Sequence, residues 1–469
     1  MNKKLLALSV AAAIGGVTAS GVAQAALEFN QDGVGHILIQ PYFTAQNGND
    51  TLINLVNTDT ANGKAVKVRF RSAGNSDDVL DFQVFLSPGD VWTASVTEGD
   101  DGRAVLKSSD KSCTLPAIPE AGVSFITQNL PPNASDEVKA EWTREGYVEF
   151  LNMGDITEST VSTSLYKNIK HVNGVAPCDQ TRLVEINKTA DLVPPTTGLA
   201  SNWIVINVPT AASWAGEAVA IEATDATNVV YYKQDDSFAV AKGAPAAAVT
   251  ADPIFVTKDV ANFDLPDLST PYDAAYATAV QQANALADAL AVTQVANEFL
   301  TVSDIAAETD WVFSMPTRRY QVAVVYDADD ASANTLAFTA GAVHFTTSNT
   351  KLSGNLACVA LSGVKSYDQE ERGSAAAGAV FSPGTIEIPR FCGEGTVLKF
   401  NGSDVLGASV ATASVSTGFD AGWTVINTNN GGNGLPVLGQ SFVKATNSGV
   451  AAGTSGNFGA GFAHRVARP

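Results

Sequence analysis

Between Thr51 and Val96 the chain alternates apolar and polar residues with a period of two, which is typical of β-strands that bury one face. The apolar positions form three stretches: Val66, Val68 and Phe70; Leu80, Phe82, Val84 and Leu86; Trp92, Ala94 and Val96. Lys67, Arg69 and Arg71 alternate with the first stretch, and we expect this charged face to meet solvent or a neighbouring molecule. The pattern predicts consecutive antiparallel strands.

Two turn signals separate these strands. Asn62-Gly63 favours the positive φ angles of a tight hairpin. The tetrapeptide that starts at Ser87 and ends at Asp90 places proline and glycine at the central positions of a type II turn. Short strands joined by such turns predict an antiparallel β-sandwich of immunoglobulin-like architecture.

The strand pattern recurs later in the chain. Trp203–Asn207 (WIVIN) is echoed by Trp423–Asn427 (WTVIN), a hint of two related domains. Further strands are predicted over Tyr147–Asn152, Tyr320–Tyr326 and Thr385–Ile388. We therefore predict a mainly β protein with two immunoglobulin-like sandwich domains and a short helical insertion.

Two helices are predicted. Ser135 can cap a short helix that Gly146 would close. A longer helix is expected to start at Thr270–Asp273, where a capping residue precedes a proline, and to continue to about Leu300. Its apolar stripe is mostly alanine, so we expect it to lie on the sandwich as an insertion: Tyr276, Val280, Ala283, Ala287 and Leu290.

The first 25 residues have the form of a signal peptide. Lys3 and Lys4 precede an apolar stretch, and a small-residue pattern ending at Ala25 predicts cleavage there. The alternative, an uncleaved anchor, would need a longer and more apolar run of about 20 residues. We expect an exported chain without a transmembrane segment, divided into the N-terminal domain 26–241, the linker and alanine-rich insertion 242–310, and the C-terminal domain 311–469.

The charge balance narrows the range of partners. The net charge is −20, and removal of the two leader lysines takes it to −22. Such an acidic chain is not expected to bind nucleic acid, because that binding relies on lysine and arginine at the phosphates. Only 16% of the residues are charged, below the usual quarter or so.

Four cysteines are present, an even number that favours disulfides in an oxidising compartment. Of the three possible pairings we favour the one that keeps each bond within one half of the chain: Cys113 with Cys178, and Cys358 with Cys392. Zinc is the weaker alternative, because the chain has no CxxC pair and no histidine near a cysteine in sequence.

No catalytic motif is present. The histidines are scattered, at His36, His171, His344 and His464. The chain has no HExxH, GxSxG, P-loop or GxGxxG. A Ser-His-Asp site assembled in space is still conceivable, but nothing in the sequence selects its members. We expect the protein not to be an enzyme.

Acidic loops are the best lead to a bound ion. Asp327, Asp329 and Asp330 follow a predicted strand, and calcium prefers loops that bring several carboxylates together. The loop lacks the glycine and the terminal glutamate of an EF-hand, so ordinary solvated turns remain the alternative. These three residues are the candidate calcium site, and no other cofactor is expected.

Other exposed groups suggest contacts. Met315–Arg319 is a basic stretch that would meet an acidic neighbour within the molecule or in another copy. Trp92, Trp203 or Trp423 could stack on sugar rings if exposed, although tryptophan on a strand is more often part of the core.

Several segments together resemble secreted cell-surface proteins of Gram-negative bacteria, some of them surface-layer or extracellular-matrix components. The resemblance is carried by GHILIQPYF, TLINLVNTD, GKAVKVRFR and NSDDVLDFQVFLSPGDVW between Gly35 and Val96, and by TDWVFSMPTRR and GWTVINT further on. It implies a structural role at the cell surface and carries no catalytic residue.

Three functions are therefore compared. The first is a structural protein that self-assembles into a surface layer or matrix, with cations bridging acidic surfaces. The second is an adhesin or carbohydrate-binding sandwich whose partners are surface glycans or outer-membrane lipopolysaccharide. The third is a secreted hydrolase with a spatially assembled site. The sequence favours the first.

Overall fold

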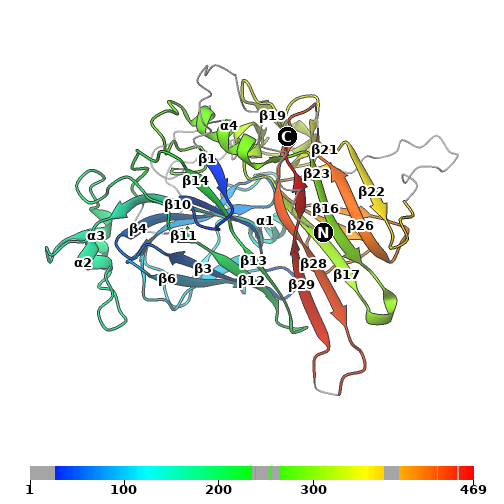
Figure 1. Cartoon of the computed structure of the whole chain (residues 1–469), viewed down its shortest axis with the longest axis horizontal. Coiled ribbons are helices and arrows are strands. Elements are labelled where there is room, and N and C mark those ends of the chain that lie inside the picture. Colours follow the sequence, from blue (N-terminus) through cyan, green and yellow to red (C-terminus); the bar gives the residue numbers. More distant parts are fainter. Residues whose placement is uncertain are drawn as a thin grey trace, which may run out of the picture.

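The computed structural model describes residues 27–234, 238, 254, 265–373, 390–429, 431–451 and 454–469. The leader with Ala25, the predicted strand Thr385–Ile388 and residues 242–253 and 255–264 of the predicted linker lie outside these ranges. Within them the chain is mainly β, as predicted, with several antiparallel sheets (Figure 1). None of the helices in these ranges has the length and apolar character needed to cross a bilayer.

The N-terminal half consists of two large sheets. Sheet 1 has the order β1 (Leu27–Asn30), β14 (Val219–Ala223), β2 (Ile37–Thr44), β10 (Glu145–Ile156), β4 (Gly63–Ser72), β5 (Asp78–Leu86) and β8 (Cys113–Leu115). Sheet 2 has the order β13 (Ala212–Glu217), β12 (Asn202–Asn207), β3 (Asn49–Asn57), β6 (Val91–Glu98), β7 (Ala104–Lys107) and β9 (Val123–Ser124), with β11 (Leu199–Ala200) beside β3.

The core of this half lies between the two sheets. Val68 and Phe82 of sheet 1 pack in one apolar cluster with Leu55, Trp92 and Val96 of sheet 2. All five side chains are buried, so the apolar positions of the alternating stretches face inward as predicted.

The two predicted turns differ in outcome. The turn at Ser87 is confirmed, because Asp90 N donates to Ser87 O at 3.1 Å and Gly89 has a φ of +70°. The prediction of a hairpin at Asn62-Gly63 is wrong, because β3 and β4 belong to different sheets. There the Asp59 carboxylate accepts backbone N–H groups of the loop, and the chain crosses from sheet 2 to sheet 1.

The expectation that Lys67, Arg69 and Arg71 face solvent or a neighbouring molecule is also wrong, since all three are buried within the chain. Each has an acidic partner on a neighbouring strand: Asp81 for Lys67, Asp78 for Arg69 and Glu149 for Arg71. A period of two identifies a polar face, but it does not reveal whether another part of the chain covers that face.

The C-terminal half contains two further large sheets. Sheet 3 has the order β22 (Gly363–Tyr367), β26 (Ala421–Asn427), β16 (Gln294–Leu300) and β30 (Arg465–Ala467). Sheet 4 has the order β25 (Thr412–Val415), β24 (Gly395–Phe400), β17 (Glu308–Ser314), β28 (Leu438–Thr446) and β29 (Asn457–Ala463). Their shared apolar cluster includes Val295, Phe299, Trp311, Phe400 and Ile426.

Short strands complete this half: β15 (Ala291–Val292) with β27 (Leu435–Pro436), β18 (Val322–Val325) with β19 (Thr335–Phe338), and β20 (Thr350–Ser353), β21 (Leu356–Ala360) and β23 (Arg390–Cys392) together. The predicted strand Tyr320–Tyr326 corresponds to β18 and the 3₁₀ turn before it. The 3₁₀ turns in the described residues are η1 (Ser303–Ile305), η2 (Arg318–Tyr320) and η3 (Ala331–Ala333).

The helices are short. Helix α1 (Asp136–Thr143) has Ser135 as its N-cap, as predicted, but it ends before Arg144, and Gly146 lies in β10. Helices α2 (Leu165–Ile169) and α3 (Gln180–Val184) lie in a long excursion between β10 and β11.

The long helix predicted from Thr270 to about Leu300 is too long at both ends. Helix α4 spans Ala279–Leu290, with Thr278 and Gln281 forming a capping box. The residues that follow form β15 and β16, so the sheets of the C-terminal half begin inside the range assigned to the linker. The alanine-rich stripe does pack on the N-terminal half, since Ala283 and Leu290 join the cluster that contains Leu27 of β1.

The two halves are joined by buried polar contacts. Arg318 of η2 donates to Asn75 Oδ1 at 3.1 Å, and its Nε lies 3.4 Å from Glu394 Oε2. Glu394 N in turn donates to Ala73 O at 2.8 Å. The basic stretch Met315–Arg319 therefore meets its acidic partner within the molecule, which was one of the two predicted outcomes.

Candidate functional site

The tryptophans differ sharply in exposure. Of the six in the chain, five are buried, among them Trp92 and Trp203, while Trp423 is 43% exposed. Two of the three tryptophans considered for sugar binding are therefore core residues, and Trp423 is the one that a ligand can reach.

Trp423 lies on the outer face of sheet 3. Its register partners are Tyr367 on β22 and Glu298 on β16. The Tyr367 and Trp423 rings are stacked, with their centroids 4.7 Å apart and their planes inclined by 16°. Because Tyr367 covers one face of the indole, the opposite face is left toward Glu298.

A groove of about 450 Å³ lies beside this aromatic pair. Ala296 and Gly422 line it with little side-chain volume, and Glu298 and Arg465 bring charged groups that lie 3.4 Å apart. A Cβ at Gly422 would lie 1.9 Å from Tyr367 O, so glycine is required for β26 to approach β22 at this point. The groove thus combines an aromatic wall with hydrogen-bonding groups.

The turn beside the groove is held by Asp368. Its carboxylate accepts the backbone N–H groups of Glu370 at 2.9 Å and Arg372 at 2.8 Å, and it pairs with the Arg372 guanidinium. The next residue, Gln369, is exposed and lines the groove. Asp368 therefore fixes the position of Gln369 relative to Trp423.

A second exposed feature is the edge of sheet 4. Within the described part of the chain, β29 has a paired neighbour only on its β28 side. Phe458 is 62% exposed and Phe462 46% exposed, and β29 contains no ionisable side chain. The alternate residues Gly459 and Gly461 face β13 so closely that a Cβ at Gly459 would lie 2.1 Å from Ser213 O. Figure 1 shows β28 and β29 as a long hairpin beside β12 and β13.

A further hollow of about 790 Å³ lies over the outer face of sheet 2. Leu52 and Ile204 are exposed there between polar neighbours such as Thr93 and Asn202. Its lining also includes charged residues of both signs, Lys107, Asp110, Lys111 and Glu120, while Trp203 at its floor is buried. This composition is that of a solvated sheet face.

The candidate calcium residues use their carboxylates within their own loop. Asp327 Oδ1 accepts the N–H groups of Asp329 and Asp330 at 3.0 Å each. Asp330 Oδ1 caps η3 by accepting Ser332 N at 2.8 Å. These contacts are those of an Asx turn and an N-cap.

No group of three or more His, Cys, Asp or Glu side chains able to hold a metal occurs among the residues that the structure describes. The other acidic loops place their carboxylates against cations: Glu98 with Arg144, Asp101 with Arg103, and Asp78 with Arg69. Calcium binding at Asp327, Asp329 and Asp330 therefore gains no support from the geometry.

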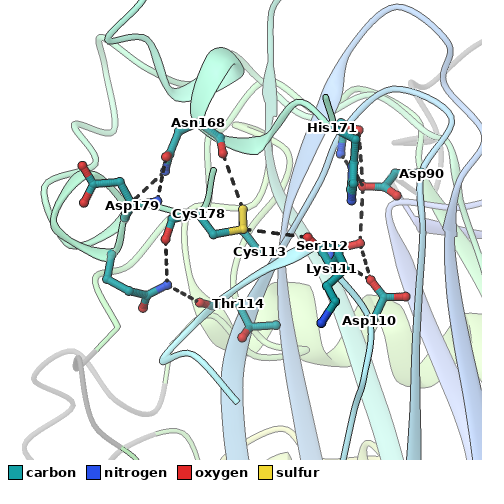
Figure 2. The surroundings of a disulfide bond; sticks show 12 residues. Asp90, Asp110, Lys111, Ser112, Cys113, Thr114, Asn168, His171, Cys178 and Asp179 are labelled. Carbon is teal, nitrogen blue, oxygen red and sulfur yellow. Dashed lines mark hydrogen bonds and ion pairs between the residues drawn. A yellow bond between two sulfur atoms is a disulfide. The ribbon is translucent and has the colours of Figure 1, made fainter. Parts of the chain in front are cut away.

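Both predicted disulfides are present, Cys113–Cys178 and Cys358–Cys392. Figure 2 shows the first of them, which ties β8 to the segment between α2 and α3. Asn168 holds that segment in place, because its Oδ1 accepts Asp179 N at 2.8 Å and its Nδ2 donates to Asp179 O at 3.2 Å.

A serine, a histidine and an aspartate meet near this disulfide (Figure 2 shows the His171–Asp90 contact). His171 Nδ1 lies 3.4 Å from Asp90 Oδ2 and 3.4 Å from Ser87 Oγ. In a catalytic triad the serine and the carboxylate occupy opposite nitrogens of the ring. Here both occupy the same nitrogen, and Asp90 also accepts Ser87 N at 3.0 Å, so the group stabilises a turn.

Sequence reasoning singled out Trp423 but missed Tyr367, Glu298, Arg465 and β29. The first three come from other strands of sheet 3, and strand order and register are long-range properties. For β29 a local signal was available, since NFGAGFA alternates phenylalanine or alanine with glycine and has no charge.

Comparison of the chain with models of known protein families, with curated proteins and with solved structures finds no match. The fold and the exposed features therefore define only a class, a mainly β protein with two disulfides, an aromatic groove and an uncharged edge strand.

Proposed function

We propose that the protein is an exported, non-enzymatic structural component of the cell surface that associates with copies of itself through β29. The observation that carries this proposal is the uncharged strand β29, which among the described residues pairs with a strand on one side only and exposes two phenylalanines. At its C-terminal end the outer edge is occupied, because Asn297 Nδ2 donates to Phe462 O at 2.9 Å. Proteins normally protect such edges with lysine, proline or a covering segment, and an unprotected edge pairs readily with another strand.

The charge distribution favours a second copy of the chain as the partner that pairs with β29. The chain has a net charge of −20, so most faces of two copies repel each other, whereas β29 brings no charge to the contact. Two β29 strands related by a two-fold axis run antiparallel and extend sheet 4 across both molecules. A two-fold contact of this kind joins two copies and leaves no β29 strand free for a third. A surface layer therefore needs a second type of contact, and we propose cations that bridge acidic faces.

Two further features support the proposal. The disulfides fit an oxidising compartment outside the cytoplasm. The described residues bring serine, histidine and aspartate together in an arrangement that suits turn stabilisation and lacks triad geometry. Export itself rests on the leader in the sequence.

Sedimentation velocity over a concentration series tests the proposal. We expect the purified chain to shift reversibly from monomer to dimer, with a dissociation constant on the order of micromolar or weaker because one short strand buries little area. Phe458→Lys with Phe462→Lys should remain monomeric, since lysine on an edge strand opposes pairing.

Val172→Lys is the matched control, because Val172 is 64% exposed and lies between α2 and α3 of the N-terminal half. The control should dimerise like the unmodified chain. A monomer at all concentrations, or a dimer that survives both phenylalanine substitutions, would contradict the proposal. Negative-stain microscopy with and without calcium then shows whether dimers extend into sheets.

A further inference from the structure

We infer that the groove beside Trp423 is a binding site for a neutral oligosaccharide built of pyranose units. The inference stands on the geometry of sheet 3 and is independent of self-association through β29.

The first step is the aromatic wall. A pyranose ring in the gluco configuration has axial C–H groups on both faces, so each face is apolar while the hydroxyls lie around the rim. An apolar face is removed from water most effectively by a flat, rigid aromatic surface. Trp423 offers such a surface, and Tyr367 stacked behind it fixes its orientation before a ligand arrives.

The second step is the set of polar groups at the rim. Glu298 and Arg465 stand across the groove from the indole, and Gln369 borders it. The Glu298–Arg465 pair is exposed on both sides, at 62% and 71%, so it is weak and its donors and acceptors can turn to sugar hydroxyls. Carboxylate, guanidinium and amide together provide both donors and acceptors, as hydroxyl recognition requires.

The third step concerns ligand charge. Glu298 and Arg465 neutralise each other, and Asp368 is paired with Arg372. The groove therefore has no excess positive charge, in a protein whose net charge is −20. An anionic saccharide would be repelled, so the ligand is neutral.

The fourth step concerns length. The groove of about 450 Å³ shares Asp368 and Gln369 with a second hollow of about 360 Å³ that is also lined by Phe419 and Asp420. Each hollow is within or near the range of small-ligand sites, roughly 300–1,000 Å³. Because the two hollows are adjacent, with Asp368 and Gln369 common to both, they fit a chain of several sugar units better than a single unit.

The protein contains its own reporter for this test. Trp423 is the exposed tryptophan among five buried ones, so acrylamide quenching of tryptophan fluorescence reports mainly on it. We expect millimolar cellohexaose to reduce the quenching and isothermal titration calorimetry to give a matching affinity. Maltohexaose and mannohexaose serve as probes of linkage and configuration.

Trp423→Ala should weaken binding about tenfold or more, because the aromatic face is lost. Trp423→Phe should keep most of the affinity, and Phe458→Ala, on β29, should leave it unchanged. Circular dichroism confirms that each variant is folded. Unchanged affinity in folded Trp423→Ala, or no binding of any of the three hexasaccharides by the unmodified chain, would overturn the inference.

Discussion

His36 is held as a neutral imidazole by the groups at its two ring nitrogens. Ala223 N–H lies 3.1 Å from Nδ1, and because an N–H can only donate, Nδ1 accepts and the ring proton is on Nε2. Nε2 then donates to Pro195 O at 3.2 Å. Burial, the main cause, lowers the pKa of His36 from 6.5 to about 4.

This shift predicts a loss of stability in acid. The folded pKa lies below the unfolded one, so the unfolded chain binds the proton more readily and unfolding becomes easier as the pH falls from about 6.5 to about 4. Between pH 7.5 and 4.5 we expect His36 to account for about 2–3 kcal/mol of the decline. Urea unfolding of the unmodified chain and of His36→Asn at both pH values measures it.

The loss of unfolding free energy between pH 7.5 and 4.5 is compared between the unmodified chain and His36→Asn. The comparison uses this loss because His36→Asn also changes the stability at pH 7.5. Equal declines in both proteins would show that His36 does not titrate on unfolding. The sequence shows four scattered histidines but gives no basis for this behaviour, because Ala223 and Pro195 reach His36 only through the fold.

At the scale of elements, the disulfide Cys113–Cys178 holds the excursion that contains α2 and α3. It links residues 65 apart in sequence, so it restricts the unfolded chain considerably. Cys113→Ala with Cys178→Ala should lower the free energy of unfolding by about 4 kcal/mol on the chain-entropy estimate. Urea unfolding under non-reducing conditions tests this.

The second disulfide provides the comparison, because Cys358 and Cys392 are 34 residues apart. Its removal should lower the free energy of unfolding by nearly the same amount, within about 1 kcal/mol of the first, because the loop-closure entropy varies slowly with loop length. A loss below about 1 kcal/mol for Cys113–Cys178 would mean that the unfolded chain keeps this segment in place without the bond.

Elements whose cause is local were predictable. Ser135 at the start of α1, the turn at Ser87 and the cysteine pairing within each half all follow from neighbouring residues or chain distance. The start of α4 was misplaced because two capping signals compete, and Thr278 with Gln281 forms the one that is used. The Asn62-Gly63 hairpin failed because its flanking strands pair with distant partners.

At the scale of the molecule, Arg318 connects the halves at a buried point. It is 1% exposed and Glu394 is 0% exposed. Arg318→Met leaves the Glu394 carboxylate buried without its main cation, which should cost about 3–5 kcal/mol. Lys444→Met is the control, because its pair with Glu308 is partly exposed and should contribute less than about 1 kcal/mol.

Scanning calorimetry distinguishes the two variants. We expect Arg318→Met to lower the melting temperature markedly and to separate the unfolding of the two halves, whereas Lys444→Met should melt like the unmodified chain. Equal effects of both substitutions would show that the contact between the halves does not depend on Arg318.

The mainly β character was visible in the sequence, but the contact between the N-terminal and C-terminal sheets was not. Lys67, Arg69 and Arg71 look like a solvated face, and only the fold shows that they are covered. Only part of the groove at Trp423 could be predicted. The sequence singles out Trp423 itself, whereas the residues around it come from other strands of the sheet and are brought there by the fold.

The charged face of β4 also has a consequence for the order of events during synthesis. Residues 63–72 leave the ribosome long before Arg318 and Glu394 do, and early domains tend to fold first. Lys67 is covered by Gln234 of the same half, whereas Arg71 lies near Tyr320 of the later half. Docking of the later half should therefore remove water from Arg71 and its partner Glu149, and this step should respond to salt.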